Sequence, residues 1–334
     1  MRRLDKPWGT WIDRSEVISF SFEGHTYKGY KGDTIASALY ANGVTTLSRS
    51  FKYHRRRGIL SMSGHDSNTM VQIGHKPNRL ADKVLIESDL RVMGQNYWGS
   101  LERDYLALLG YLGHFLPVGF YYKAFYKPRW AWPLWSKLIR RIAGLGIVSL
   151  DTPHGYYDKQ YLFSDVAVIG GGAAGLAAAL EAAKEGAEVL LIDENPVLGG
   201  ALNYARFDST GEIADSTRLE LLDKIHSEPK IKVMTDTMAT GWYADNWLPL
   251  VKGNRLYKLR SKNVVVATGC YEQPLIFRNN DLPGIMLGSA AQRLIRQYGV
   301  KPGKRAVIVT AGCDGYGVAL DLVDAGTDVA CVVD

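Results

Sequence analysis

The chain has 334 residues, of which 46% are hydrophobic and 22% are charged. This is the composition of an ordinary globular protein, and a chain of this length can bury a large core, which argues against a disordered or fibrous protein. The formal net charge of +6 is only mildly basic, and the densest basic run, residues 52–57, has no counterpart elsewhere in the chain, so we expect no nucleic-acid partner.

The first domain predicted along the chain is a small β-rich module at residues 1–99. Residues 18–22 alternate apolar and polar side chains as a half-buried strand does, and a return strand begins at residues 26–28 after a Gly-His turn. A helix follows at residues 34–42, with Thr34 or the aspartate before it as the N-cap. Strand, hairpin, strand and helix in this order are typical of the start of a ferredoxin-like β-grasp domain. Later in the module, short strands are expected at residues 70–73 and 83–86.

Residues 100–160 are predicted to form an aromatic, helical linker or interface segment. Its apolar stretch at residues 105–126 is interrupted by polar residues and a proline, whereas a membrane-spanning helix needs about 20 consecutive apolar residues. Large exposed apolar patches usually mark interfaces. We therefore expect this stretch to be buried or to contact another subunit, and we expect no membrane contact.

The cysteines and the N-terminus indicate the cellular compartment in which we expect the protein. The three cysteines, Cys270, Cys313 and Cys331, form no CxxC pair, and an odd, sparse set argues against a disulfide framework and against a structural zinc site. Residues 1–11 lack the apolar core of a signal peptide. We therefore expect a cytoplasmic protein with no metal site.

The domain predicted at residues 161–300 is a Rossmann-type FAD/NAD(P)-binding domain. Residues 165–169 form a clear strand, and a G-x-G-x-x-G motif follows it directly at residues 170–175. A strong helix, a glycine that stops it and a second strand at residues 188–192 come next, and Asp193 closes that strand. A lone glycine motif is weak evidence, but here all the parts that dinucleotide binding requires follow in order.

Each position of the glycine motif has a physical role in this prediction. Gly170 allows the tight turn out of the strand, Gly172 lets the backbone approach a pyrophosphate, and Gly175 lets the helix lie close to the sheet. The first helical residues, Ala173 and Ala174, offer unpaired N–H groups and a partial positive charge to the phosphates.

The acidic residues after the second strand and the loop behind them complete the predicted site. Asp193 can accept hydrogen bonds from the adenosine ribose hydroxyls, and Glu194 takes that role if the strand ends one residue later. Residues 195–200 are expected to fold back over the cofactor, because Gly199 and Gly200 permit a close approach.

The end of the chain supplies two more predictions. A strand at residues 263–266 runs into Ala-Thr-Gly, and its Thr268 and Gly269 are expected beside the pyrophosphate. Residues 301–334 begin a second Rossmann unit, whose glycine spacing does not fit the binding motif. We therefore expect a structural unit without a second strong site. Because no later strand closes this unit, we expect a fragment of a longer polypeptide or one part of a split gene.

The dinucleotide motif alone would indicate only a flavoprotein or an NAD protein, so a more specific resemblance depends on other segments as well. The segments that carry it are residues 12–14, 32–39, 41–44, 49–55, 58–59, 115–117, 119–123, 170–175 and 281–284. On these segments the sequence resembles, over nearly its whole length, the N-terminal third of the alpha subunit of heterotetrameric sarcosine oxidase.

The resemblance implies an activity that the residues alone do not. It implies a complex that oxidises the N-methyl group of sarcosine to give glycine and hydrogen peroxide, with the one-carbon unit passing to tetrahydrofolate when that is present. It implies NAD in the alpha subunit's dinucleotide site, FAD and FMN in the beta subunit with the FMN at the alpha–beta interface, and gamma and delta subunits besides. The folate-handling part belongs to the C-terminal region of the alpha subunit, which is absent from this chain.

The resemblance also bears on an iron–sulfur cluster. Related dehydrogenase subunits carry a [2Fe–2S] cluster in this β-grasp domain, and such clusters take about four thiolate ligands. The equivalent residues 58–67 contain no cysteine, so we expect no cluster, and the histidines nearby have no spacing typical of a metal site.

Three hypotheses follow from the sequence. The favoured one is the dinucleotide-binding part of an oxidoreductase complex that oxidises N-methyl amines such as sarcosine, with no catalytic residue of its own in this chain. The second is an FAD-binding subunit of an opine, proline or cyanide-forming dehydrogenase. The third is a scaffold subunit with a vestigial site. FAD and NAD share their ADP half, so the motif leaves the choice between them open.

Overall fold

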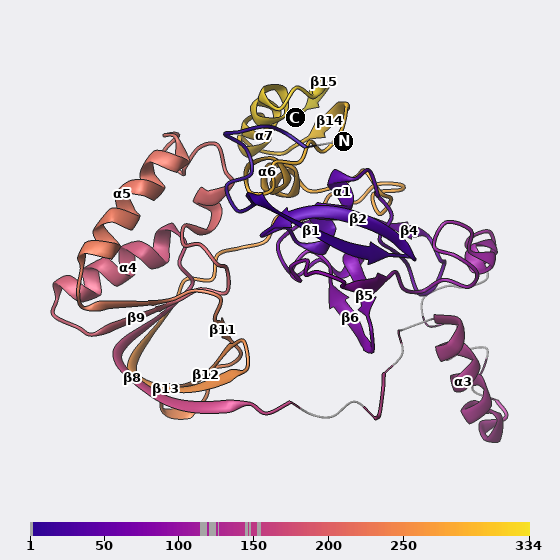
Figure 1. Ribbon diagram of the computed structural model, residues 1–334, viewed down its shortest axis with the longest axis horizontal. Helices are drawn as coiled ribbons and strands as arrows, with labels where there is room; N and C mark the ends of the chain where they lie inside the picture. The colour runs from indigo at the N-terminus through magenta and orange to yellow at the C-terminus, as the bar shows by residue number, and fades with distance from the viewer. Residues whose placement is uncertain are drawn as a thin grey trace. The chain divides into compact units, whose positions relative to one another are not determined.

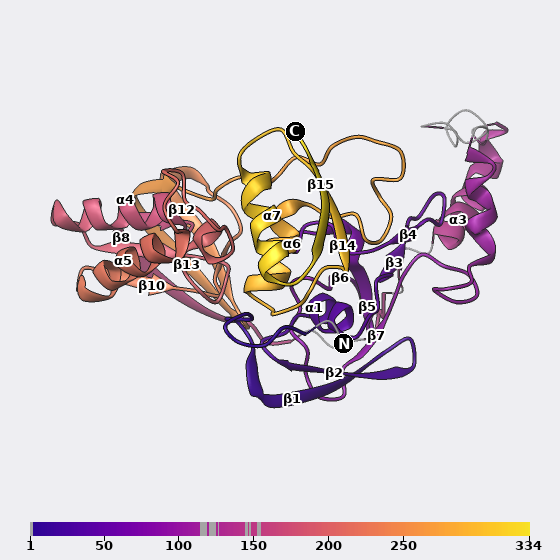
Figure 2. The ribbon, with the colours of Figure 1, turned by 90° about the horizontal axis from the view of Figure 1, so that it is seen from above.

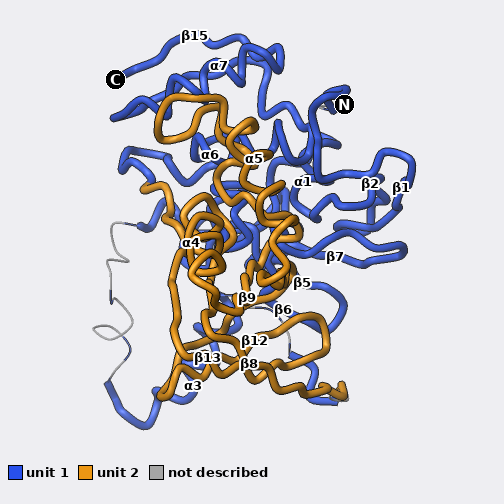
Figure 3. The backbone as a smooth tube through the Cα atoms, turned by 90° about the vertical axis from the view of Figure 1, so that its left-hand side faces the viewer, with its two compact units in different colours: residues 1–152, 274–334 blue, residues 153–273 orange. Residues whose placement is uncertain are grey.

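The computed structural model describes most of the chain and divides it into two compact units. One unit comprises Met1–Thr152 with Pro274–Asp334, and the other comprises Pro153–Gln273 (Figure 3). The four domains predicted from the sequence, with their three boundaries, stay a prediction, because these units are defined by contacts and the first is discontinuous in the chain. The described residues are 3–334 except 114–118, 120–124, 126, 144–145, 147 and 152–154.

The N-terminal part of the first unit is the expected β-grasp domain (Figure 1). Its sheet has the order β2-β1-β7-β5-β6, in which β1 pairs antiparallel with β2 and parallel with β7. The elements are β1 (Asp13–Phe22), β2 (His25–Lys31), α1 (Ile35–Ala41), β5 (Met70–Ile73), β6 (Lys76–Leu80) and β7 (Arg91–Met93), with the short pair β3 (Ser48–Arg49) and β4 (Arg56–Arg57) beside them.

Helix α1 is the centre of this domain's core. All its residues are buried, and Ile35 and Leu39 pack with the inward face of β1. Thr34 is the N-cap and forms a capping box with Ser37, which confirms the predicted start of the helix. The strand expected at residues 83–86 is wrong, because only Leu85 makes a single bridge, to Thr34.

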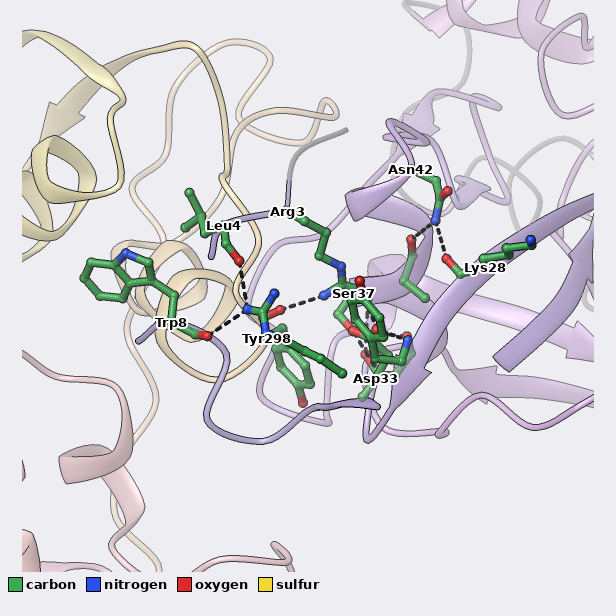
Figure 4. A network of polar contacts seen from close by, with 12 residues as sticks. Arg3, Leu4, Trp8, Lys28, Asp33, Ser37, Asn42 and Tyr298 are labelled. Atoms are coloured by element: carbon green, nitrogen blue, oxygen red, sulfur yellow. Dashed lines mark hydrogen bonds and ion pairs between the residues drawn. The ribbon is translucent and has the colours of Figure 1, made fainter. Parts of the chain in front are cut away.

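A buried carboxylate at the start of α1 joins the N-terminal segment to the domain (Figure 4). Asp33 is fully buried, accepts hydrogen bonds from Ser37 Oγ and the Tyr30 N–H, and pairs with the Arg3 guanidinium. The same guanidinium donates to the Tyr298 carbonyl at 2.6 Å. Asp33 therefore has a structural role here, because a buried carboxylate requires partners of this kind.

The C-terminal part of the first unit contains the predicted second β-α-β unit. Strands β14 and β15 are parallel, and α7 lies against both of them (Figure 2). Arg296 and Gln292 donate to the buried Asp321 carboxylate, which ties α6 to α7. The elements are α6 (Gly288–Arg296), β14 (Arg305–Val309), α7 (Asp314–Asp324) and β15 (Asp328–Val333).

Part of the aromatic segment is helical among its described residues. Its elements are the short helices η2 (Tyr105–Gly110) and η4 (Arg129–Ala131) and the helix α3 (Trp132–Ala143), and Trp130 and Leu134 are exposed. Two segments of the sequence resemblance, 115–117 and nearly all of 119–123, lie outside the described residues. In the parts of the chain that are described, no helix has the length and apolar character needed to span a bilayer.

The second unit is a Rossmann-type sheet with helices on one face (Figure 1). Its strand order is β10-β9-β8-β13-β12-β11, and β8 pairs parallel with both β9 and β13. Helices α4 and α5 bury Leu176 and Ile225 against Val168 and Leu191 of the sheet. The elements are β8 (Asp158–Ile169), α4 (Ala173–Lys184), β9 (Val189–Ile192), α5 (Ala214–Ser227), β10 (Ile231–Met234), β11 (Met238–Ala239), β12 (Trp247–Lys252) and β13 (Arg255–Val266).

Two buried carboxyls organise the loop between β4 and β5. Asp66 accepts from the N–H groups of Leu60 at 2.6 Å and Ser61 at 3.0 Å. Asp82 accepts from the Gly64 N–H at 2.7 Å. Burial, together with the neighbouring Asp66 carboxylate, raises the pKa of Asp82 to about 6, because desolvation and a like charge both disfavour ionisation.

This raised pKa predicts a pH dependence of stability. Between pH 4 and 6 folded Asp82 keeps a proton that the unfolded chain has already lost, so its contribution is present at acid pH and is lost as the pH rises through the folded pKa. We expect the free energy of unfolding to fall by about 2 kcal/mol from this group between pH 4 and 7. Urea unfolding of the whole chain across this range, compared with Asp82→Asn, measures it.

In Asp82→Asn the fall in the free energy of unfolding between pH 4 and 7 should be smaller by about 2 kcal/mol, because the titrating group is gone. Glu87→Gln, which removes an exposed carboxylate from the same segment, is the matched control and should keep the wild-type profile. An unchanged profile in Asp82→Asn would contradict the raised pKa.

Candidate functional site

The glycine motif forms the bend between β8 and α4 in the second unit. Gly170 has φ +104°, and a Cβ there would overlap the Ala267 carbonyl oxygen. A Cβ on Gly175 would overlap the Gly170 carbonyl oxygen, so α4 starts in backbone contact with the bend. Only glycine fits both positions, which agrees with the roles predicted for them.

Gly172 has a different reason to be glycine. It is the N-cap of α4 with φ −78°, a conformation open to any residue, and the nearest atom to a Cβ there would be Gly200 Cα at 3.7 Å. Neither backbone strain nor packing within the chain requires a glycine here. A bare backbone with free space in front of it is what the approach of a ligand requires.

The N-terminus of α4 is not capped by a side chain. Gly172 has none to offer, and Ala173 and Ala174 are exposed. The first turn of a helix carries N–H groups without helical partners and a partial positive charge. The residues present therefore fit the diphosphate of a dinucleotide.

The loop after β9 lies directly on the bend, and its predicted place over a bound cofactor stays a prediction. The Gly199 N–H donates to the Gly171 carbonyl at 2.8 Å, and Gly199 forms a parallel bridge with Gly172. A Cβ on Gly200 would lie 2.7 Å from Gly172 Cα. These two glycines therefore let the loop meet the motif backbone to backbone.

The structure turns Asp193 toward the protein. The residue is 6% exposed, and its carboxylate Oδ2 accepts from the Gly171 N–H at 2.6 Å. Oδ1 accepts from the N–H and the side-chain amide of Asn195, at 2.7 and 3.0 Å. The next residue, Glu194, is half-buried. Ribose binding by either acid stays a prediction.

The end of β13 brings the remaining predicted residues to the same edge of the sheet. Val266 pairs with Ile169 in parallel register, and the position of a Cβ on Gly170 would be 3.2 Å from Thr268 Cα. Gly269 has φ +74° and open space around it. The bend, Asp193 and Thr268 thus come from the carboxyl ends of three adjacent strands, where open α/β sheets bind ligands.

Three residues of this region have contacts to which reasoning from sequence assigns no role. Gly171 is an unassigned position of the motif, Asn195 gives no motif signal, and the Arg218 side chain from α5 lies beside Gly199, where it pairs with Asp215 at 2.6 Å. Only the tertiary fold brings Arg218 to this loop. Its spacing from Asp215 indicates no more than a surface ion pair on one helix.

Two family models match the chain. Residues 164–334 match the pyridine nucleotide-disulphide oxidoreductase model, and residues 15–97 match the model for a 2Fe-2S iron-sulfur cluster binding domain. The first match spans the glycine motif and the second β-α-β unit.

The second match contradicts the prediction that the chain has no iron–sulfur cluster. That prediction depended on the cysteines alone, which all follow residue 269. It is wrong, because residues 15–97 match a family of cluster-binding domains. Tested against the residues present, this range supplies none of the roughly four thiolates that such clusters take. The residues present therefore do not fit a cluster held by thiolates alone.

Similar proteins confirm the resemblance predicted from the sequence. Sarcosine oxidase subunit alpha of Rhizobium meliloti (strain 1021) is 39% identical over 97% of this chain and 35% of its own length. The protein of that name from Corynebacterium sp. (strain P-1) is 28% identical over 96% of the chain and 31% of its own. The chain thus spans about a third of these relatives.

A solved structure shares the fold. L-proline dehydrogenase from P. horikoshii superposes with a TM-score of 0.70 over 100% of this chain and 56% of its own, at 22% sequence identity. This likeness supports the Rossmann-type domain preceded by a ferredoxin-like domain.

The geometry of the bend predicts opposite results for two glycine substitutions. Gly175→Ala forces a methyl group into the Gly170 carbonyl and should lower the free energy of unfolding by about 2–4 kcal/mol. Gly172→Ala meets no protein atom within 3.7 Å and should lower it by less than about 1 kcal/mol, the scale of an N-cap change. Urea unfolding of the two variants measures this, and equal losses would contradict it.

Proposed function

Because the chain belongs to the pyridine nucleotide-disulphide oxidoreductase family, we propose that it is the dinucleotide-binding part of a sarcosine oxidase-like flavoenzyme complex. It binds the ADP half of NAD, or of FAD, at the bend of residues 170–175. The observation that carries this proposal is Gly172, a glycine that neither the conformation nor the packing of the protein requires, at the uncapped start of α4.

The binding role of each residue follows from the site. The N–H groups of Ala173 and Ala174 at the exposed first turn of α4 donate to the diphosphate. Gly172 lets the diphosphate approach the backbone, and Thr268 and Gly269 line the same edge of the sheet. Asp193 or Glu194 accepts from the ribose hydroxyls.

The dinucleotide supplies hydride transfer when it is bound. This chain's part is to bind and orient it, and we propose no catalytic residue here. The substrate proposed is an N-methyl amine such as sarcosine, because two relatives of this chain carry sarcosine in their name.

The proposed complex is a heterotetramer. Since the chain spans about a third of the relatives' length, and those relatives are named as subunits, we propose beta, gamma and delta partner subunits. We propose that transfer of the one-carbon unit to tetrahydrofolate depends on residues outside those of this chain.

Thermal unfolding of the whole chain with NAD, FAD or ADP tests the binding proposal. A ligand that binds the folded state selectively at 100 times its Kd adds about 2.7 kcal/mol of stability. We expect ADP and one of the two dinucleotides to raise the Tm. Yellow flavin colour in the purified protein would identify FAD.

A matched pair of variants makes this test specific to the bend. Gly172→Ala should weaken binding by about tenfold or more, because a methyl group occupies the space in front of the helix. Gly312→Ala adds a methyl group in open space at the equivalent bend before α7 and should bind like the wild type. Binding that both variants keep, or a wild-type chain whose Tm none of the ligands changes, would contradict the proposal.

A further inference from the structure

We propose that Asp193 is a positioning residue: its carboxylate holds the Gly171 peptide group and so sets the shape of the bend before a ligand arrives. The inference rests on the proposed function insofar as the bend binds a diphosphate. It assigns Asp193 to the protein side of the site, in contrast to a direct contact with the ribose.

The N–H side of Gly171 gives the first observation. This N–H is buried and donates to Asp193 Oδ2 at 2.6 Å. A buried N–H without an acceptor costs about 1–3 kcal/mol, so Asp193 stabilises the conformation in which the N–H points at it. The same contact removes this N–H from the groups that a diphosphate could use.

The carbonyl group of Gly171 gives the second observation. Its oxygen accepts from the Gly199 N–H at 2.8 Å. A Cβ on Gly171 would overlap Leu198 and lie 3.0 Å from Asp193 Oδ2. Both polar groups of Gly171 are therefore engaged, one by the end of β9 and the other by the loop that follows it.

Both oxygens of the carboxylate accept hydrogen bonds from the protein. The second oxygen accepts from the backbone N–H and from the side-chain amide of Asn195, and Asp193 is 6% exposed. A buried carboxylate is tolerated where such donors surround it. The half-buried neighbour Glu194 is the better placed of the two acids to reach a ligand outside the protein.

Three variants separate positioning from sugar binding. Asp193→Ala removes the acceptor, Asp193→Asn keeps one oxygen that can accept the Gly171 N–H, and Glu194→Ala is the matched control on the adjacent acid. The first readout needs no ligand: hydrogen exchange of the Gly171 amide, measured by NMR on the whole chain. We expect slow exchange in the wild type, Asp193→Asn and Glu194→Ala, and fast exchange in Asp193→Ala.

The second readout uses ADP-ribose and 2′-phospho-ADP-ribose as probes, because they differ only at the ribose. Distortion of the bend weakens the binding of both probes alike, so Asp193→Ala should lose about tenfold or more in affinity for each probe, with an unchanged ratio of the two affinities. Asp193→Asn should restore most of the affinity. Glu194→Ala should change the ratio in favour of the phosphorylated probe, because an acid beside the ribose repels a 2′-phosphate.

The two readouts also separate the failure of this inference from the failure of the proposed function. A wild-type chain that binds neither probe contradicts the proposed function, while the exchange of the Gly171 amide still decides the inference. Slow exchange in Asp193→Ala, or a ratio that changes in that variant and stays constant in Glu194→Ala, would overturn the positioning role. If Asp193→Ala does not fold, Asp193→Asn decides through the ratio alone.

Discussion

The site depends on one close contact, between the carbonyl of Gly170 and the backbone of Gly175. Because no side chain separates them, α4 begins directly behind the end of β8, and its unpaired N–H groups face the edge of the sheet. A larger residue at either position would move the helix away from the bend. The space in front of Gly172 is suited to a diphosphate only because this contact places a helix N-terminus beside it.

The chain uses one device repeatedly to hold its loops: a buried aspartate that accepts backbone N–H groups. Asp33 accepts such a group before α1, and Asp193 accepts one at the glycine motif. Asp66 and Asp82 accept N–H groups of the loop between β4 and β5. Each carboxylate fixes the direction of N–H groups that have no partner in a helix or sheet. In the β-grasp domain this device organises the loop within the range that matches a cluster-binding family.

How far the sequence could predict this structure depends on the range of the interactions. Periodicity and capping residues gave α1 with its Thr34 cap and the strand–bend–helix at residues 165–185, because these signals are local. The strand expected at residues 83–86 is wrong, since an apolar run does not reveal whether a neighbouring strand will pair with it. Reasoning from cysteines likewise did not anticipate the family match of residues 15–97. The direction of the Asp193 carboxylate depends on Gly171 and Asn195 together, and a motif fixes the residue type but not the rotamer.

A crystal structure of the chain grown with ADP would show where the diphosphate binds. We expect the diphosphate in front of Gly172, within hydrogen-bond distance of the N–H groups of the first turn of α4, with the Gly171 peptide unchanged. Bound ADP at another place on the chain, with the space in front of Gly172 filled by protein side chains, would contradict it.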